Sequence, residues 1–235
     1  MTFQRPTKQV ATVIGKNYLD PNNKYLYISF LVENKHLMEP LPGQFVSLQV
    51  AQNTYRSYSI CASNIKNGVF SIVAAVAHDG IGSTYLKSLE CGHAIDFIGP
   101  AGRFILSPLS MNTNIVFVST GTGIAPFMTM LDTLLQFDYK HKVTFIHGAR
   151  YEHELLFLEE IETYSKSIDN FESILCVSSS DKRVTSVLPI SSNVHYYLCG
   201  NPNMVEDAKS LLAQNNIGAD CIFTEKFTHA KQIKS

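Results

Sequence analysis

Residues 115–126 have the sequence IVFVSTGTGIAP, and the organisation of the second half of the chain can be interpreted from them. The run IVFV is short and apolar, which is typical of a buried strand. Two glycines follow and allow a tight turn, and Pro126 is tolerated in the first turn of a helix. A strand that leads through such a turn into a helix is the first half of a βαβ unit.

The rest of this half repeats the alternation of strand and helix. In the helical pattern at 152–164, Leu155, Leu158 and Ile161 fall on one stripe, which predicts its buried face. Alternating strands and helices predict a parallel sheet that is covered on both faces. Strands are expected at 115–118, 143–146, 174–177, 194–198 and 221–224, and helices at 125–135, 152–164 and 204–214.

The first half, residues 9–106, has a different pattern of apolar residues, without the alternation of strand and helix. Short runs rich in β-branched and aromatic residues are separated by turn sequences such as DPNN, EPLPG and HDGIGS. This spacing is typical of an antiparallel sandwich or barrel. We therefore predict two domains: an antiparallel β-barrel at residues 1–107 and an α/β domain with a parallel sheet at residues 108–235.

Composition excludes several classes of protein. The 235 residues hold 19 Lys and Arg against 20 Asp and Glu, which argues against nucleic acid as the main partner. Five scattered cysteines without a CxxC spacing argue against a disulfide framework, a zinc ribbon and an Fe–S cluster held by this chain alone. No apolar run reaches the roughly 18 residues of a membrane helix, and the start MTFQRPTKQV does not resemble a signal peptide. We expect a cytoplasmic protein with no bound metal and no membrane span.

Two turns of the second half fall where ligands of parallel sheets bind, at the carboxyl ends of strands. The turn at 121–126, GTGIAP, lets the backbone approach a phosphate, toward which the helix directs its N–H groups. The turn at 199–204, CGNPNM, begins a helix with Asn201 as N-cap and Pro202 at the first position. Capping leaves Cys199, at the strand end, unexplained. The alternative at 121–126 is a tight turn without a ligand, and at 199–204 it is a capped helix start alone.

The first half holds a further candidate site in YRSYS, residues 55–59. Alternation places Arg56 and Tyr58 on one face of the strand and Ser57 and Ser59 on the other. A guanidinium can bind a phosphate and a tyrosine can stack on a flat ring, although an exposed polar strand is the alternative. The sequence DGIGST at 79–84 then predicts a short helical stretch that favours an anion, or a turn with Ser83 as N-cap.

These motifs occur in one order along the chain. They are RSYS at 56–59, GS at 82–83, GTGIAP at 121–126, CGNPNM at 199–204 and EKF at 225–227. The set resembles the ferredoxin–NADP reductase superfamily over nearly the whole chain, and most of all its compact bacterial ferredoxin (flavodoxin) reductases. The resemblance implies that the barrel has Greek-key topology and binds FAD, and that the α/β domain binds NADP(H), with NAD(H) as the alternative.

The resemblance also implies roles for single residues. Arg56 would hold the FAD pyrophosphate, Tyr58 would stack on the isoalloxazine, and Thr122 would lie between flavin and nicotinamide. Ser59 near flavin N5, Cys199 near nicotinamide C4 and Glu225 would form the catalytic set. The implied cofactor contacts are Arg56, Ser57, Tyr58, Ser59, Val73, Ala74, Ala75, Val76, Ile81, Gly82, Ser83, Gly121, Thr122, Gly123, Arg150, Ser178, Arg183, Cys199, Gly200, Asn201, Pro202, Met204, Glu225 and Phe227.

The choice of NADPH follows from three positions at which relatives bind the 2′-phosphate. Arg150 matches an arginine after the second strand of the α/β domain, and Arg183 matches a later one. Ser178 matches the serine of a Ser-Arg pair after the third strand, but Ser179 stands where the arginine is expected. Two matching arginines of three favour NADPH.

The function implied by the resemblance is an FAD-dependent NAD(P)H oxidoreductase that passes electrons to ferredoxin or flavodoxin. The partner would bind transiently, and we expect a monomer. One alternative is an oxidoreductase that releases free reduced flavin, and another is a reductase subunit of an oxygenase or Fe–S complex. Lys226, Lys231 and Lys234 suggest a basic patch for an acidic carrier. The tail THAKQIKS after Phe227 leaves open whether this ring or the tail covers the flavin.

Overall fold

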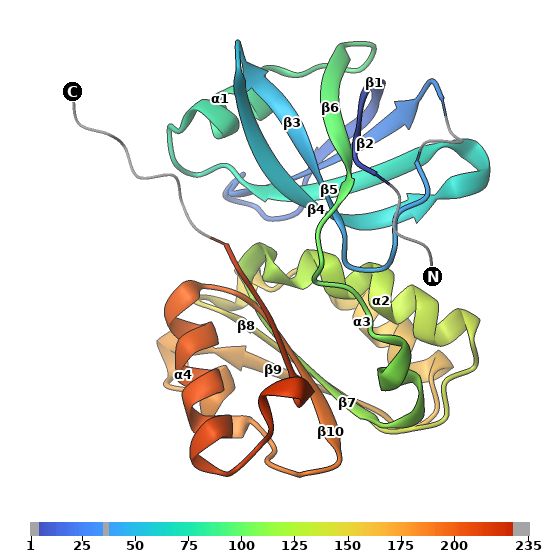
Figure 1. Cartoon of the computed structure of the whole chain (residues 1–235). Coiled ribbons are helices and arrows are strands. Elements are labelled where there is room, and N and C mark those ends of the chain that lie inside the picture. The colour runs from blue at the N-terminus through green and yellow to red at the C-terminus, as the bar shows by residue number, and fades with distance from the viewer. Residues whose placement is uncertain (1–4, 35–37, 228–235) are drawn as a thin grey trace.

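The first domain of the computed structural model is a closed antiparallel barrel, and residues 5–34 and 38–227 of the chain are described (Figure 1). The strand order around the barrel is β1-β2-β5-β4-β3-β6. Because β3, β4 and β5 are successive neighbours and β2 lies beside β5, the topology is a Greek key, which confirms the prediction. The strands are β1 (Thr7–Tyr18), β2 (Tyr25–Val32), β3 (Phe45–Ala51), β4 (Thr54–Asn64), β5 (Val69–Ala75) and β6 (Ala94–Ala101).

A short helix, α1 (Ile81–Ser88), packs against the barrel and is fastened to it from β1. A bulge in β1 between Val13 and Gly15 places Lys16 directly opposite the buried Ile28. The Lys16 ammonium donates hydrogen bonds to the carbonyls of Lys87 and Leu89, at 2.7 and 2.6 Å. These carbonyls lie at the C-terminal end of α1, which favours a cation. The position of α1 against the barrel therefore depends on β1.

The second domain is a parallel sheet with the order β11-β10-β7-β8-β9, as expected from the alternating pattern (Figure 1). Helices α2 (Ala125–Gln136) and α3 (Leu158–Ser167) cover the face toward the barrel, and α4 (Pro202–Gln214) covers the other face. The strands are β7 (Asn114–Thr120), β8 (Val143–Ala149), β9 (Phe171–Val177), β10 (Val194–Gly200) and β11 (Ile222–Lys226).

The helix predicted at 152–164 is wrong in its first half. A 3-10 turn covers Glu152–Glu154, and α3 begins only at Leu158. The break comes at Phe157, which has a left-handed φ of 57°, while the Leu156 N–H donates to the ring of buried His147. Leu158 is consequently 42% exposed and not on the buried stripe, whereas Ile161 is buried as predicted.

The two domains share one hydrophobic cluster, so they do not pack as independent bodies. It contains Cys61 and Val73 of the barrel together with Phe127 of α2. The connection at residues 102–113 includes a 3-10 helix, Pro108–Asn112, and the Ser107 N–H donates to the Tyr197 hydroxyl at 2.9 Å. The boundary at 107/108, which lies in this connection, stays a prediction. Among the described residues, every helix is too short or too polar to cross a membrane.

Candidate functional site

The carboxyl ends of the parallel strands face a cleft of about 530 Å³ that the barrel closes on one side. Residues after all five strands of the sheet line it, and Lys24, Tyr25, Ala75, Ala77 and His78 line it from the barrel. Eleven of the predicted contacts lie here: Ala75, Gly121, Thr122, Arg150, Ser178, Arg183, Gly200, Asn201, Pro202, Met204 and Phe227.

The end of the cleft at β7 and β10 is formed by backbone packed on backbone. A Cβ atom on Gly123 would lie 2.4 Å from the Cys199 carbonyl oxygen, so this position excludes any side chain. Gly200 has φ 130°, and its Cβ would lie 2.6 Å from the Thr120 hydroxyl oxygen. That hydroxyl accepts the Asn201 N–H at 3.0 Å. The two predicted turns therefore form one surface.

The α4 end of the cleft follows the sequence prediction. The Asn201 side chain accepts the N–H groups of Asn203 and Met204, at 2.9 and 3.4 Å, and Pro202 is the first helical residue. Phe227 lies beside this turn, because its N–H donates to the Gly200 carbonyl at 2.9 Å. The residue that follows β11 is thus an aromatic one that lines the cleft.

Ser59, Cys199 and Glu225 meet where the barrel joins the sheet. The Ser59 hydroxyl donates to Glu225 Oε2 at 3.4 Å, and Glu225 is the register partner of Cys199. Burial raises the pKa of the Glu225 carboxyl to about 7, against a smaller lowering by the Ser59 hydrogen bond. Burial, with a contribution from Glu225, raises the pKa of the Cys199 thiol well above its usual range. The carboxyl can therefore take up or release a proton near neutral pH, while the thiol stays neutral.

Arg56 and Tyr58 of β4 lie against the start of α1. A Cβ atom on Gly82 would lie 2.6 Å from the Tyr58 hydroxyl and 3.2 Å from Arg56 Cγ. The N-cap of α1 is Gly80, which has no side chain to satisfy the N–H groups of the first turn. The alternative with Ser83 as N-cap is therefore wrong. Arg56 thus lies beside the first turn of α1, and a guanidinium and free helix N–H groups are donors that suit an anion.

One backbone edge of β5 extends beyond its partner strand. In the described ladders, β4 pairs with β5 from Asn64 to Ile60, which lies opposite Ile72. Val73, Ala74 and Ala75 pair only with β2 on the other side. Their backbone groups can therefore contact a flat ligand. Ser57 does not join this site, because its hydroxyl pairs with Ser47 on the outer face at 3.0 Å.

Among the cleft residues that the sequence did not predict, Lys182, Lys24 and Glu154 carry charges that bear on ligand binding. Lys182 lines it next to Arg183, and the adjacent basic pair was the signal for it. Lys24 and Glu154 line it from different domains and form an ion pair of 2.7 Å. Nothing in the local pattern indicates that pair, because its partners are 130 positions apart.

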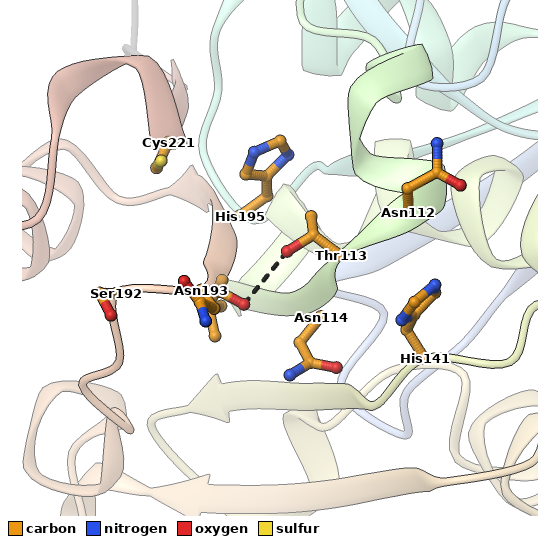
Figure 2. Close-up of a pocket in the computed structure, with 9 residues that line it drawn as sticks. Asn112, Thr113, Asn114, His141, Ser192, Asn193, His195 and Cys221 are labelled. Carbon is orange, nitrogen blue, oxygen red and sulfur yellow. Dashed lines mark hydrogen bonds between the residues drawn. The ribbon is translucent and has the colours of Figure 1, made fainter.

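A second hollow lies at the opposite, amino ends of β7 and β10. Figure 2 shows its polar lining, with Thr113 Oγ1 donating to the Asn193 carbonyl at 3.1 Å. His141, His195 and Cys221 belong to it, but none of the predicted site residues does. Within residues 5–34 and 38–227, no group of three or more His, Cys, Asp or Glu side chains could hold a metal ion.

Comparisons with known proteins agree with the two-domain architecture. Residues 11–105 match the family described as oxidoreductase FAD-binding domain, and residues 117–210 match the oxidoreductase NAD-binding domain. The toluate 1,2-dioxygenase electron transfer component of Pseudomonas putida is 32% identical over 199 residues, which are 80% of this chain and 58% of that protein. Ferredoxin–NADP reductase B of Sorangium cellulosum is 30% identical over 143 residues, 61% of this chain and 55% of that protein.

Among solved structures, the fold is similar to ferredoxin–NADP+ reductase from Plasmodium falciparum with 2′P-AMP. The TM-score is 0.80 at 21% identity, over 96% of this chain and 98% of that chain. The chain spans little more than half the length of the two curated relatives described above. The likeness of fold thus extends over both domains.

Proposed function

This chain belongs to the ferredoxin–NADP reductase superfamily, and from that premise we propose that it is an FAD-containing NAD(P)H oxidoreductase. In this proposal it passes electrons from NADPH through flavin to a one-electron carrier such as ferredoxin or flavodoxin. The observation that carries the proposal is the meeting of Ser59, Cys199 and Glu225 at the junction of the FAD-binding and NAD-binding domains.

The residues present fit FAD. Arg56 and the first N–H groups of α1 would hold its pyrophosphate, and the missing side chain of Gly82 keeps the two elements close. The backbone of residues 73–75 would contact the flat ring system, on which Tyr58 would stack. Bound FAD supplies the chemistry, since a flavin accepts a hydride and returns its electrons singly.

The chain's own residues would position the nucleotide, exclude water and hold a proton. Hydride transfer requires the reacting atoms within about 3–3.5 Å, and the close backbone packing of Gly123 on Cys199 and Gly200 fixes the surface for the nicotinamide. Glu225 would hold a proton on its carboxyl near neutral pH, with Ser59 as its hydrogen-bond donor. Phe227, anchored on Gly200, would exclude water from the flavin side.

We expect Arg56→Ala to weaken FAD binding by about 1.5–3 kcal/mol, the range for a hydrogen bond to a charged group. Riboflavin, which has no phosphate, should bind wild type and variant equally. Flavin fluorescence titration of the apoprotein measures both constants, and Arg103→Ala, an exposed arginine of the same domain, is the control. An equal loss for FAD and riboflavin would show that Arg56 does not contact the pyrophosphate.

The alternative functions are separated by the visible spectrum of the purified protein and by its acceptors. Stoichiometric FAD and NADPH-dependent reduction of a ferredoxin or flavodoxin would support the main proposal. A colourless protein that oxidises NADPH only with added flavin would support release of free reduced flavin. FAD with reduction only of an oxygenase or Fe–S partner would support the subunit function, which the dioxygenase electron transfer relative favours.

Two of the lysines suggested for docking an acidic carrier, Lys231 and Lys234, lie outside the described residues, and so does the tail after Phe227.

NADPH is the proposed donor because cations outnumber carboxylates in the lining of the cleft: Lys24, Arg150, Lys182 and Arg183 against Glu154 and Asp207. Arg150, Arg183 and Ser178 are the predicted contacts of the 2′-phosphate, and Lys182 adds a third cation beside them that Ser179 does not supply. We expect Arg150→Ala to raise KM for NADPH about tenfold to one-hundredfold and to leave KM for NADH nearly unchanged. Steady-state kinetics with both donors measures this. Equal increases for the two nucleotides would place Arg150 away from the 2′-phosphate.

A further inference from the structure

The ion pair between Lys24 and Glu154 joins the barrel to the α/β domain across the cleft. Lys24 Nζ lies 2.7 Å from Glu154 Oε1, and both residues line the cleft. The Glu154 side chain is 8% exposed and that of Lys24 31% exposed. A carboxylate that is so little exposed, beside a proposed phosphate site, needs an explanation.

Lys24 is held firmly on the barrel wall. The Asp20 carboxylate accepts the N–H groups of Asn22, Lys24 and Tyr25 at 2.7–3.0 Å. The Lys24 carbonyl in turn accepts the Val76 N–H at 2.8 Å. The backbone of Lys24 is thus fixed beside β5, and its ammonium extends toward the other domain.

The same wall faces the phosphate-binding turn. Tyr25 follows Lys24, and a Cβ atom on Gly121 would lie 3.6 Å from the Tyr25 hydroxyl. Lys24, Gly121 and Thr122 line one cleft. A diphosphate on the glycine turn would therefore share the cleft with a lysine of the barrel.

Glu154 lies on the opposite wall, in the 3-10 turn four residues after Arg150. Its carboxylate shares the cleft with Arg150, Lys182 and Arg183, where it opposes the binding of an anion. Lys24 is its ion-pair partner at 2.7 Å. A phosphate that recruits Lys24 has to compete with Glu154 for it.

We propose that Lys24 binds the diphosphate of the pyridine dinucleotide from the barrel side, and that Glu154 holds Lys24 beforehand and lowers the affinity. This inference rests on the proposed function. It differs from recognition of the 2′-phosphate, because NADP+ and NAD+ carry the same diphosphate. Lys24 therefore sets affinity for both nucleotides, whereas Arg150 distinguishes them.

The two partners of the pair should shift binding in opposite directions. Lys24→Met keeps the aliphatic stem and should raise the Kd of NADP+ and of NAD+ about tenfold each, as expected for a lost charge-assisted hydrogen bond. Glu154→Gln keeps the shape but removes the carboxylate that pairs with the lysine, leaving its contact with the Tyr25 ring, and should lower both Kd values about threefold. Isothermal titration of the FAD-loaded protein with each nucleotide measures these constants.

A purely structural role of the ion pair predicts a different outcome for the nucleotide Kd values of the two variants. If the pair only holds the domains together, both variants lose the same contact and both bind more weakly. Weaker binding in both variants, or an unchanged Kd in either, overturns the proposal. Because Glu154→Gln is expected to improve binding, poor folding cannot imitate that result.

Matched controls and the wild type separate this inference from the function it rests on. Glu152→Gln removes an exposed carboxylate from the same turn, and Lys8→Met removes an exposed lysine from β1, so both should leave Kd unchanged. A wild-type protein that binds FAD but neither nucleotide refutes the proposed function itself. Nucleotide binding by the wild type without the opposite shifts refutes only the role of Lys24 and Glu154.

Discussion

Replacing Gly123 with alanine should lower the free energy of unfolding by about 3 kcal/mol and slow NADPH oxidation at least about one-hundredfold. The added Cβ would lie 2.4 Å from the Cys199 carbonyl oxygen and 2.5 Å from Gly200 Cα. Both neighbours are backbone atoms, so no side chain can rotate away. The end of β10 has to move from the end of β7, and the nicotinamide surface moves with it. Urea unfolding and steady-state kinetics with an artificial one-electron acceptor measure the two effects.

Gly121→Ala in the same turn is the matched control. Gly121 has φ 54°, and its Cβ would meet only the Tyr25 hydroxyl, at the ordinary distance of 3.6 Å. Alanine there should cost about 1–2 kcal/mol for the left-handed backbone and leave β10 in place. If Gly123→Ala is no more harmful than Gly121→Ala, close packing of the two turns does not determine the geometry of the cleft.

The fold class of each domain could be predicted from sequence because the signals for it are local, whereas the Greek-key topology of the barrel was implied only by the family resemblance. The period of the apolar residues distinguishes β-rich from alternating segments, and each strand end is marked by its turn. The helix at 152–164 could not be predicted in the same way. The helix breaks at Phe157, next to Leu156, whose N–H donates to the ring of His147 on β8. The spacing of apolar residues along a helix does not show that a side chain elsewhere in the fold, here His147, takes the N–H that the helix would need.

In the candidate site too, residues marked by local patterns could be predicted, whereas contacts between distant parts of the chain could not. Gly121, Thr122, Gly200 and Asn201 could be placed together because all carboxyl ends of a parallel sheet lie at one edge. Ser59 and Glu225, 166 positions apart, were linked only by resemblance to a family, since no pattern brings a barrel strand to the end of β11. Lys24 and Glu154 had neither a periodic signal nor a motif, and their pairing depends on how the domains dock.

Lowering the pH from 6.5 toward 3 should destabilise the protein through His147. This residue is fully buried, and burial lowers the pKa of its imidazole to about 3. Nε2 accepts the Leu156 N–H at 3.3 Å, so the ring proton lies on Nδ1, which donates to the Ser119 hydroxyl at 2.8 Å. A second ring proton would have to bind Nε2, and the ring would then lose the hydrogen bond that it accepts from the Leu156 N–H.

The sign and size of this loss of stability follow from the linkage between proton binding and unfolding. Between the folded pKa of about 3 and the unfolded value of 6.5, the unfolded chain binds more protons at this residue than the native protein does. The contribution of neutral His147 is complete above pH 6.5, declines as the pH falls, and levels off below pH 3. At pH 4.5 the loss from this one group is about 2–3 kcal/mol.

His147→Gln and His147→Asn test this, because each keeps one of the two hydrogen bonds and neither titrates. Both variants should be less stable than the wild type at pH 7.5, yet lose about 2–3 kcal/mol less on going to pH 4.5. Urea unfolding at the two pH values gives the difference, and His141→Asn, an exposed histidine at the far end of the sheet, is the control. An identical acid loss in wild type and both variants would assign it to the carboxylates instead. Protonation of His147 also removes the acceptor of the Leu156 N–H, two residues after Glu154. A smaller loss of stability at pH 4.5 in both variants would therefore assign that loss to protonation of this imidazole.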